Sequence, residues 1–139
     1  MVMIKEYDMP DELYYSTRHM WLRVEGDEAV VGVTDFTQKA AGEVTYVELP
    51  SEGDRAEAGE LVGSMETGKW MGKLYAPVSG EITAVNTDLD DNPGLINEDP
   101  YGKGWIFRVR LSDRSEVDAL MHGPAVAPWL EKEIAANIK

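Results

Sequence analysis

The chain has 139 residues and carries 26 acidic side chains against 13 basic ones, a formal net charge of −13 at pH 7. This excess of negative charge repels phosphate groups, so neither nucleic acid nor an anionic membrane is expected as a partner. The sequence holds no cysteine and only two histidines. These counts exclude disulfides, thiolate metal sites and a cysteine nucleophile, and they argue against a histidine-rich metal site.

The amino-terminal residues predict no targeting segment. Residues 1–4 are apolar, but Lys5 and Glu6 follow at once, so this apolar run is far shorter than the core of a signal peptide. Elsewhere no apolar run approaches the ~18 residues that a membrane span needs. We therefore expect a cytoplasmic protein.

Short strands separated by turns dominate the middle of the chain. Residues 21–24 and 29–33 flank Gly26-Asp27 and predict a hairpin with its turn at that pair. Residue 105 begins the clearest alternation of apolar and charged residues, typical of a strand with one buried face. The further strands are expected at 44–49, 61–66, 74–76, 80–85 and 105–111.

Helices are expected in only three places. Thr34 and Asp35 are suited to cap a helix that ends before Gly42, and Asp113 is suited to cap a helix over residues 115–121. Residues 127–138 carry apolar side chains at a spacing of four, typical of a helix with one buried stripe. We predict a single domain over residues 1–139 that is mainly β, with a core at about 14–123, short flanking helices and a C-terminal helix over 127–138.

No residues stand out as catalytic or metal-binding. Asp88, Asp90 and Asn92 have the spacing of a calcium loop, but Pro93 stands where that loop needs a glycine, and Asp99 stands where it needs a longer glutamate. We interpret this segment as a solvated acidic loop. The sequence holds neither a nucleophile elbow nor a zinc-protease motif. Of the two histidines, His19 is expected to be a packed, hydrogen-bonded residue at the entry to a strand.

Lys69 is the one candidate for covalent chemistry. Glycines at positions 63, 68 and 72 bracket it, which favours a tight, exposed turn between two strands. A lysine at such a turn is usually only a solvated charge. On a rigid β scaffold, however, its amine could also be acylated and serve as the root of a mobile arm.

A set of short motifs resembles the H protein family of the glycine cleavage system. In chain order these are His19-Met20-Trp21, Gly32-Val33-Thr34-Asp35, Val47-Glu48-Leu49-Pro50, Glu66-Thr67-Gly68-Lys69, 75–81, Asn92-Pro93 and 97–105. The resemblance covers residues 14–123. It implies a barrel-sandwich hybrid of the biotinyl/lipoyl carrier type, with lipoic acid held in amide linkage on Lys69. The Met-Lys-Met of biotin carriers is absent.

The residues around Lys69 take their roles from the same resemblance. Glu66 matches the glutamate that precedes a lipoyl lysine in this family. The arm would be surrounded by Thr67, Gly68 and Trp70. The enzyme that attaches lipoate would recognise the same residues. The large apolar face of Trp70 could also cover the dithiolane or form a docking surface.

The chain departs from the family pattern around Lys69, where Glu-Thr-Gly-Lys-Trp-Met-Gly replaces the usual Glu-Ser-Val-Lys-Ala-Ala-Ser, and at two further positions. Met20 stands where a glutamate is usual, and a thioether accepts no strong hydrogen bond from a cationic amine. Ala40 stands where a histidine is usual. Both positions belong near the docked arm. The stretch from Glu66 to Trp70 also resembles H-like lipoate-binding proteins that serve a sulfur-oxidation system.

These departures lead us to favour a carrier of sulfur species, not an enzyme itself, whose partner is a heterodisulfide-reductase-like complex. The alternative is an H protein that carries an aminomethyl group between glycine decarboxylase, aminomethyltransferase and dihydrolipoyl dehydrogenase. Either carrier also needs a lipoate-attaching enzyme. A further alternative, from another class, is an unmodified scaffold that has lost its arm.

Overall fold

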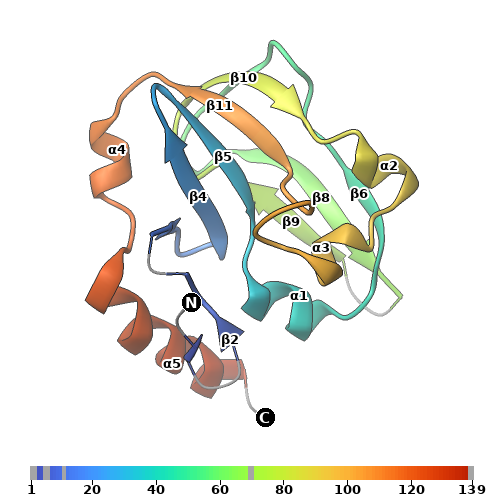
Figure 1. Cartoon of the computed structure of the whole chain (residues 1–139), viewed down its shortest axis with the longest axis vertical. Helices are drawn as coiled ribbons and strands as arrows, with labels where there is room; N and C mark the ends of the chain where they lie inside the picture. Colours follow the sequence, from blue (N-terminus) through green and yellow to red (C-terminus); the bar gives the residue numbers. More distant parts are fainter. Residues whose placement is uncertain (1–2, 5–6, 11, 69–70, 138–139) are drawn as a thin grey trace.

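A six-stranded antiparallel sheet forms the larger part of the fold (Figure 1). In the computed structural model the described residues are 3–4, 7–10, 12–68 and 71–137. The strand order in this sheet is β3-β4-β5-β11-β10-β7. Its strands are β3 (Tyr14–Tyr15), β4 (Met20–Glu25), β5 (Glu28–Val33), β7 (Arg55–Ala56), β10 (Gly80–Val85) and β11 (Phe107–Leu111).

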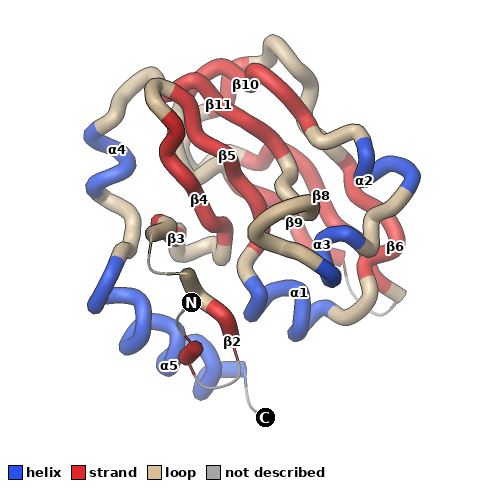
Figure 2. Tube along the Cα trace, viewed as in Figure 1, coloured by secondary structure: helices blue, strands red, loops and turns tan. Residues whose placement is uncertain are grey.

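A three-stranded antiparallel sheet lies against the first one and closes the core between them (Figure 2). It has the order β6-β8-β9, with β6 at Val44–Glu48, β8 at Leu61–Thr67 and β9 at Met71–Tyr75. Leu22 and Phe107 from the six-stranded sheet share one buried cluster with Met65 and Leu74 from the three-stranded sheet. A small sheet pairs β1 (Met3–Ile4) with β2 (Tyr7–Asp8).

A second buried cluster fastens the C-terminal helix to the back of the six-stranded sheet. Helix α5 (Val126–Asn137) contributes Leu130, which is fully buried together with Trp21 of β4. The indole nitrogen of Trp21 donates a hydrogen bond to the carbonyl oxygen of Pro100 at 2.9 Å. Burying an aromatic ring with its polar atom satisfied stabilises this layer strongly.

Helix α1 (Asp35–Ala41) forms as the sequence predicts. The hydroxyl of Thr34 accepts a hydrogen bond from the backbone N–H of Thr37, and Gly42 ends the helix with a positive φ of 91°. A side-chain oxygen at the N-cap and a glycine after the last turn are the local signals that set these boundaries. The hairpin of β4 and β5 also forms where predicted, with φ of 67° at Gly26 in its turn.

Two short helices replace the expected acidic loop. Helices α2 (Asp88–Asp91) and α3 (Leu95–Glu98) occupy the segment, and each buries one apolar side chain, Leu89 and Ile96 respectively. A single apolar anchor in a four-residue helix produces no periodic pattern, which is why the sequence did not reveal them.

The remaining elements differ from expectation mainly at their ends. Helix α4 (Ser115–Asp118) is shorter than the expected 115–121, and a 3₁₀ turn (Gly123–Ala125) precedes α5. Asp113 still binds the start of α4, since it accepts a hydrogen bond from the Ser115 backbone N–H at 3.0 Å. The mainly β fold with short flanking helices and a C-terminal helix is confirmed. Within the described ranges no helix has the length and apolarity to cross a bilayer.

Candidate functional site

The turn between β8 and β9 is the site where the sequence predicts the modified lysine. Glu66 of β8 pairs with Met71 of β9, so the two strands form a hairpin, and Thr67 and Gly68 are the described residues beyond that pair. Gly68 is exposed, and a Cβ built on it would meet no atom within 4 Å. Lys69 and Trp70 themselves lie outside the described residues. The hairpin is therefore present, and the roles of Lys69 and Trp70 stay predictions.

A groove of about 730 Å³ opens between α1, β9 and α5, and we call it the α1 groove. Its lining includes the apolar side chains of Met20, Met65 and Leu74, which are at most 3% exposed. Helix α1 adds Ala40 to one wall, and α5 adds Ile134. An aliphatic chain would find mostly hydrocarbon contacts in such a groove.

Met20 and Ala40, the two predicted departures from the family pattern, thus lie in one groove. Met20 is 1% exposed and belongs to the core cluster between the sheets, so its thioether packs among apolar neighbours. Ala40 lies on the exposed side of α1. The structure brings together two residues that are twenty positions apart, and both offer apolar surface only.

Charged and titratable side chains also line the groove, around its apolar part. The guanidinium of Arg18 lies over the ring of Tyr75, 4.5 Å from its centroid, and Lys73 projects from β9. His19 and Glu133 meet across the groove wall, with Nε2 of the imidazole 2.8 Å from Oε1 of the carboxylate. The sequence identified His19 as a packed residue, and this is confirmed; Glu133 was not identified.

His19 is held tightly in its place before β4. Its backbone has φ of 65°, the left-handed region that non-glycine residues seldom occupy. Its ring lies 5.0 Å from the rings of both Phe36 and Trp129, centroid to centroid. Burial lowers the pKa of His19, although the hydrogen bond with Glu133 acts in the opposite direction. Burial therefore favours the neutral imidazole, and a carboxylate at this distance accepts from the Nε2–H of the ring.

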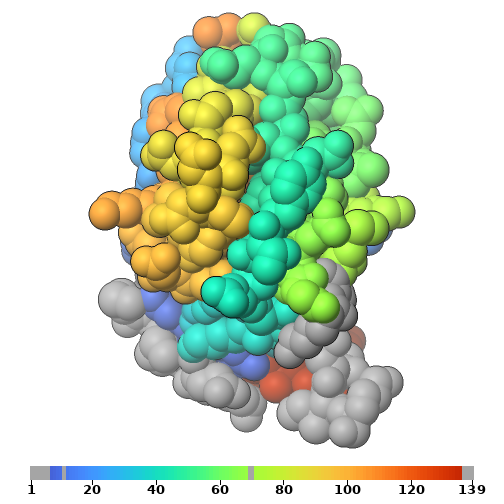
Figure 3. Space-filling model, turned by 90° about the vertical axis from the view of Figure 1, so that its right-hand side faces the viewer, coloured from blue at the N-terminus to red at the C-terminus, as the bar shows by residue number. Residues whose placement is uncertain are grey.

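The other face of the three-stranded sheet carries the exposed apolar side chains. Tyr46, Leu61 and Met71 are 53%, 52% and 64% exposed. All three line a second, shallow groove, which Glu66 also lines. Figure 3 shows β6 crossing the middle of this side, between α2 and α3 and the β8–β9 hairpin. Glu66 therefore lies beside the hairpin tip but does not line the α1 groove.

The arrangement is suited to holding an acyl arm. Among the described residues no three acidic or histidine side chains are placed to hold a metal ion. An exposed hairpin tip next to an apolar groove fits lipoic acid, whose aliphatic chain and dithiolane are apolar while its amide linkage stays near the tip. The attached group would supply a disulfide that opens to a dithiol, and the chain would supply the surface around it.

Comparisons with known proteins identify the family. The family described as Glycine cleavage H-protein matches residues 13–133. A glycine cleavage system H protein of Halalkalibacterium halodurans is 46% identical over 126 residues, covering 91% of this chain and 98% of that protein. Another, from Rubrobacter xylanophilus, is 49% identical over 110 residues, covering 79% and 87%.

A solved structure supports the same assignment. The crystal structure of a glycine cleavage system H protein from Mycobacterium marinum superposes with a TM-score of 0.79 at 32% identity, covering 90% of this chain and 98% of that one. This likeness confirms the barrel-sandwich fold of lipoyl carriers. The chain belongs to the glycine cleavage H-protein family, whose members act as carriers, not catalysts, and hold lipoate covalently on a lysine.

Proposed function

We propose that this chain carries an aminomethyl group in glycine cleavage, on lipoate attached to Lys69. The observation that carries the proposal is the family match over residues 13–133, which includes the β8–β9 hairpin. The relatives described above all bear the glycine cleavage name. The comparisons therefore favour the alternative that the sequence ranked second, and they give no support to the preferred carrier of sulfur species.

Its partners under this proposal are glycine decarboxylase, aminomethyltransferase and dihydrolipoyl dehydrogenase, together with a lipoate-attaching enzyme. The net charge of −13 would steer the carrier toward basic surfaces on these enzymes. Glu66, Thr67 and Gly68 are described and lie at the hairpin tip. This placement supports their proposed role in presenting Lys69 to the attaching enzyme.

One observation still favours the sulfur-carrying function as a second candidate. Met20 and Ala40 add no polar side-chain atom to the α1 groove, while Arg18 and Lys73 bring two positive charges to its rim against one negative charge from Glu133. Such a rim suits an anionic cargo better than a cationic one. The heterodisulfide-reductase-like complex would then be the partner. The two functions differ in the sign of the cargo's charge.

The test begins with the intact mass of the protein after incubation with lipoate and a lipoate-attaching enzyme. The expected mass is that of the chain with one lipoyl group. Lys69→Arg should abolish the modification, whereas Lys73→Arg, the matched control on β9, should leave it unchanged. Modification that persists in Lys69→Arg would overturn the assignment of Lys69, and no modification at all would favour the unmodified scaffold.

The second step separates the two cargoes. The lipoylated protein is incubated with glycine decarboxylase and isotope-labelled glycine, and the label bound to the protein is measured. Retained label on the wild type, and none on Lys69→Arg, is the expected result. A lipoylated protein that takes up no label would overturn the aminomethyl function and leave the sulfur function.

A further inference from the structure

Met71 is the exposed methionine of the β8–β9 hairpin, and the proposed function gives it no role. Its side chain is 64% exposed. Among the other methionines whose exposure the structure describes, Met121 is partly buried and three are at most 2% exposed: Met9, Met20 and Met65. The chain holds no cysteine, so no thiol competes for an oxidant before lipoate is attached. A hydroperoxide in solution would therefore reach the sulfur of Met71 before the buried sulfurs.

The side chain of Met71 belongs to a row across the three-stranded sheet. Met71 lies directly opposite Glu66 of β8, which in turn lies opposite Tyr46 of β6. Side chains directly opposite each other share one face of a sheet, with Cβ atoms about 5 Å apart. All three line the shallow groove, together with Leu61. The row therefore places exposed apolar surface on both sides of one carboxylate.

This row lies next to the residue that the proposed function modifies. Met71 is two positions after Lys69, and Glu66 is three positions before it. An enzyme that forms an amide at the amine of Lys69 has to cover the strand ends on both sides of that lysine, because the new bond is only one side chain away from the backbone. Met71 would then make an apolar contact with the enzyme.

We propose that Met71 is a site of oxidation by hydroperoxides, and that its sulfoxide slows the attachment of lipoate to Lys69. The effect on attachment rests on the proposed function, because it requires that Lys69 is modified. In the oxidation, a lone pair of the Met71 sulfur attacks the outer oxygen of hydrogen peroxide. The sulfur–oxygen bond forms as the oxygen–oxygen bond breaks, water leaves, and the sulfur gives up two electrons.

The sulfoxide changes the chemistry of the row. A flexible apolar side chain becomes a polar one with a hydrogen-bond acceptor, opposite the Glu66 carboxylate, which is itself an acceptor. An enzyme surface that accommodates an apolar methionine would desolvate the new oxygen without supplying a donor, which weakens binding. The step is reversible, because a methionine sulfoxide reductase removes the oxygen as water while two thiols become a disulfide.

The site of oxidation is tested on the unmodified full chain, the form that the attaching enzyme takes as its substrate. The protein is treated with hydrogen peroxide, the peroxide is removed with catalase, and fragment masses assign the added oxygen to individual methionines. Met71 should be oxidised at least about tenfold faster than Met20 and Met65, because exposing a buried sulfur requires local unfolding. Equal rates at the three methionines would overturn the site.

The effect on attachment is measured as the rate of lipoate uptake, by intact mass, with and without peroxide treatment. Oxidised wild type should be modified about fivefold more slowly than untreated wild type, and a methionine sulfoxide reductase should restore the rate. Met71→Leu, the matched control, keeps an apolar side chain of similar volume without the sulfur, so peroxide should not change its rate. Met71→Gln, which is polar without any treatment, should be as slow as oxidised wild type.

The outcomes separate this inference from the function on which it rests. Oxidised wild type that is modified at the untreated rate, or Met71→Leu that peroxide slows as much as wild type, overturns the effect on attachment and leaves the carrier function intact. Untreated wild type that takes up no lipoate overturns the carrier function and the effect on attachment together. In that case the fragment masses still decide whether Met71 is the site of oxidation.

Discussion

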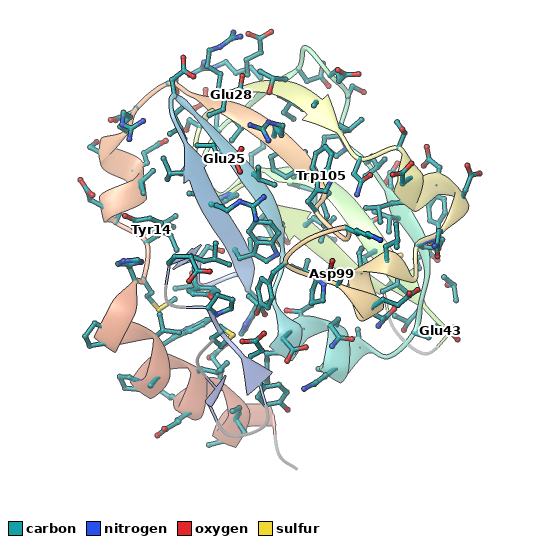
Figure 4. All side chains as sticks on the ribbon, viewed as in Figure 1. Tyr14, Glu25, Glu28, Glu43, Asp99 and Trp105 are labelled. Atoms are coloured by element: carbon teal, nitrogen blue, oxygen red, sulfur yellow. The ribbon has the colours of Figure 1, made fainter. Side chains whose placement is uncertain are left out.

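Two hairpins of this molecule, β4–β5 and β8–β9, each contain glycine, but they differ in the contacts made at their turns. In the first, β4 and β5 turn at Gly26, and side chains from elsewhere in the fold fasten the tip. Arg108 binds both Glu25 and Glu28, at 2.9 and 3.1 Å, and Arg114 donates to the carbonyl oxygen of Gly26. Glu25 and Glu28 are labelled in Figure 4. This tip is part of the surface network of the six-stranded sheet.

In the second hairpin, β8 and β9 pack against the core, whereas residues near the turn are exposed. Met65 and Leu74 are buried in the core, whereas Gly68 has open space around it and Met71 is 64% exposed. Burial therefore positions the strands of the second hairpin, whereas Gly68, next to its turn, is exposed. Substitutions in both hairpins test this contrast.

Gly63→Ala tests how tightly the strands of the second hairpin are packed. A Cβ at this position would lie 2.3 Å from the backbone carbonyl oxygen of Glu48 on β6. Backbone atoms yield little, so the β6–β8 pairing would have to separate, and we expect a loss of about 3 kcal/mol in the free energy of unfolding. Urea unfolding followed by tryptophan fluorescence measures it. A loss below about 1 kcal/mol would mean that the sheet is loosely packed.

Alanine at the two tips compares them directly. Gly26 has φ of 67°, a conformation that costs a residue with a Cβ about 1 kcal/mol. Gly68 has neither a positive φ nor a neighbour within 4 Å of its Cβ position. We therefore expect Gly26→Ala to lower the free energy of unfolding by about 1 kcal/mol, and Gly68→Ala to change it by less than about 0.5 kcal/mol. Equal losses at the two tips would remove the contrast between them.

The parts of the fold that the sequence predicted are those set by local signals. The Gly26-Asp27 turn, the Thr34 cap and the Gly42 stop each act within a few residues, and each is present. The bond between His19 and Glu133 joins residues 114 positions apart. Only the packing of α5 against β4 and α1 creates it, so no pattern in the sequence could have indicated it.

The choice of cargo shows a different limit of the sequence. The preference for sulfur rested on substitutions such as Met20 and Ala40, near one arm. Identity of 46–49% to H proteins over most of the chain carries more weight than these few positions. Glu133 on α5 lies in the groove that Met20 and Ala40 line, which neither local motif reveals.

Arg108→Gln tests whether the ion pairs of Arg108 at the turn of the first hairpin contribute to stability. Hydrogen bonds from Arg23 and Arg108 lower the pKa of Glu25 below its ordinary value of 4.5. A carboxyl with a lowered pKa stabilises the fold fully above its unfolded pKa, and this contribution is lost as the pH falls through the folded pKa. Because these groups are largely solvated, we expect a loss of only about 0.5 kcal/mol at neutral pH, which shrinks as Glu25 becomes protonated.

The measurement is the urea midpoint of Arg108→Gln and wild type at pH near 7 and again in acid, well below the ordinary pKa of 4.5 for Glu25, where its carboxyl takes up a proton. Arg110→Gln is the matched control on the same strand, because Arg110 has a single ion pair, with Glu81, and both side chains are at least half exposed. The control should lose less than Arg108→Gln. A difference between Arg108→Gln and wild type that is the same at both pH values would show that Arg108 acts by packing its stem against the sheet. The turn of the first hairpin would then be stabilised by packing of the Arg108 side chain and not by its charge.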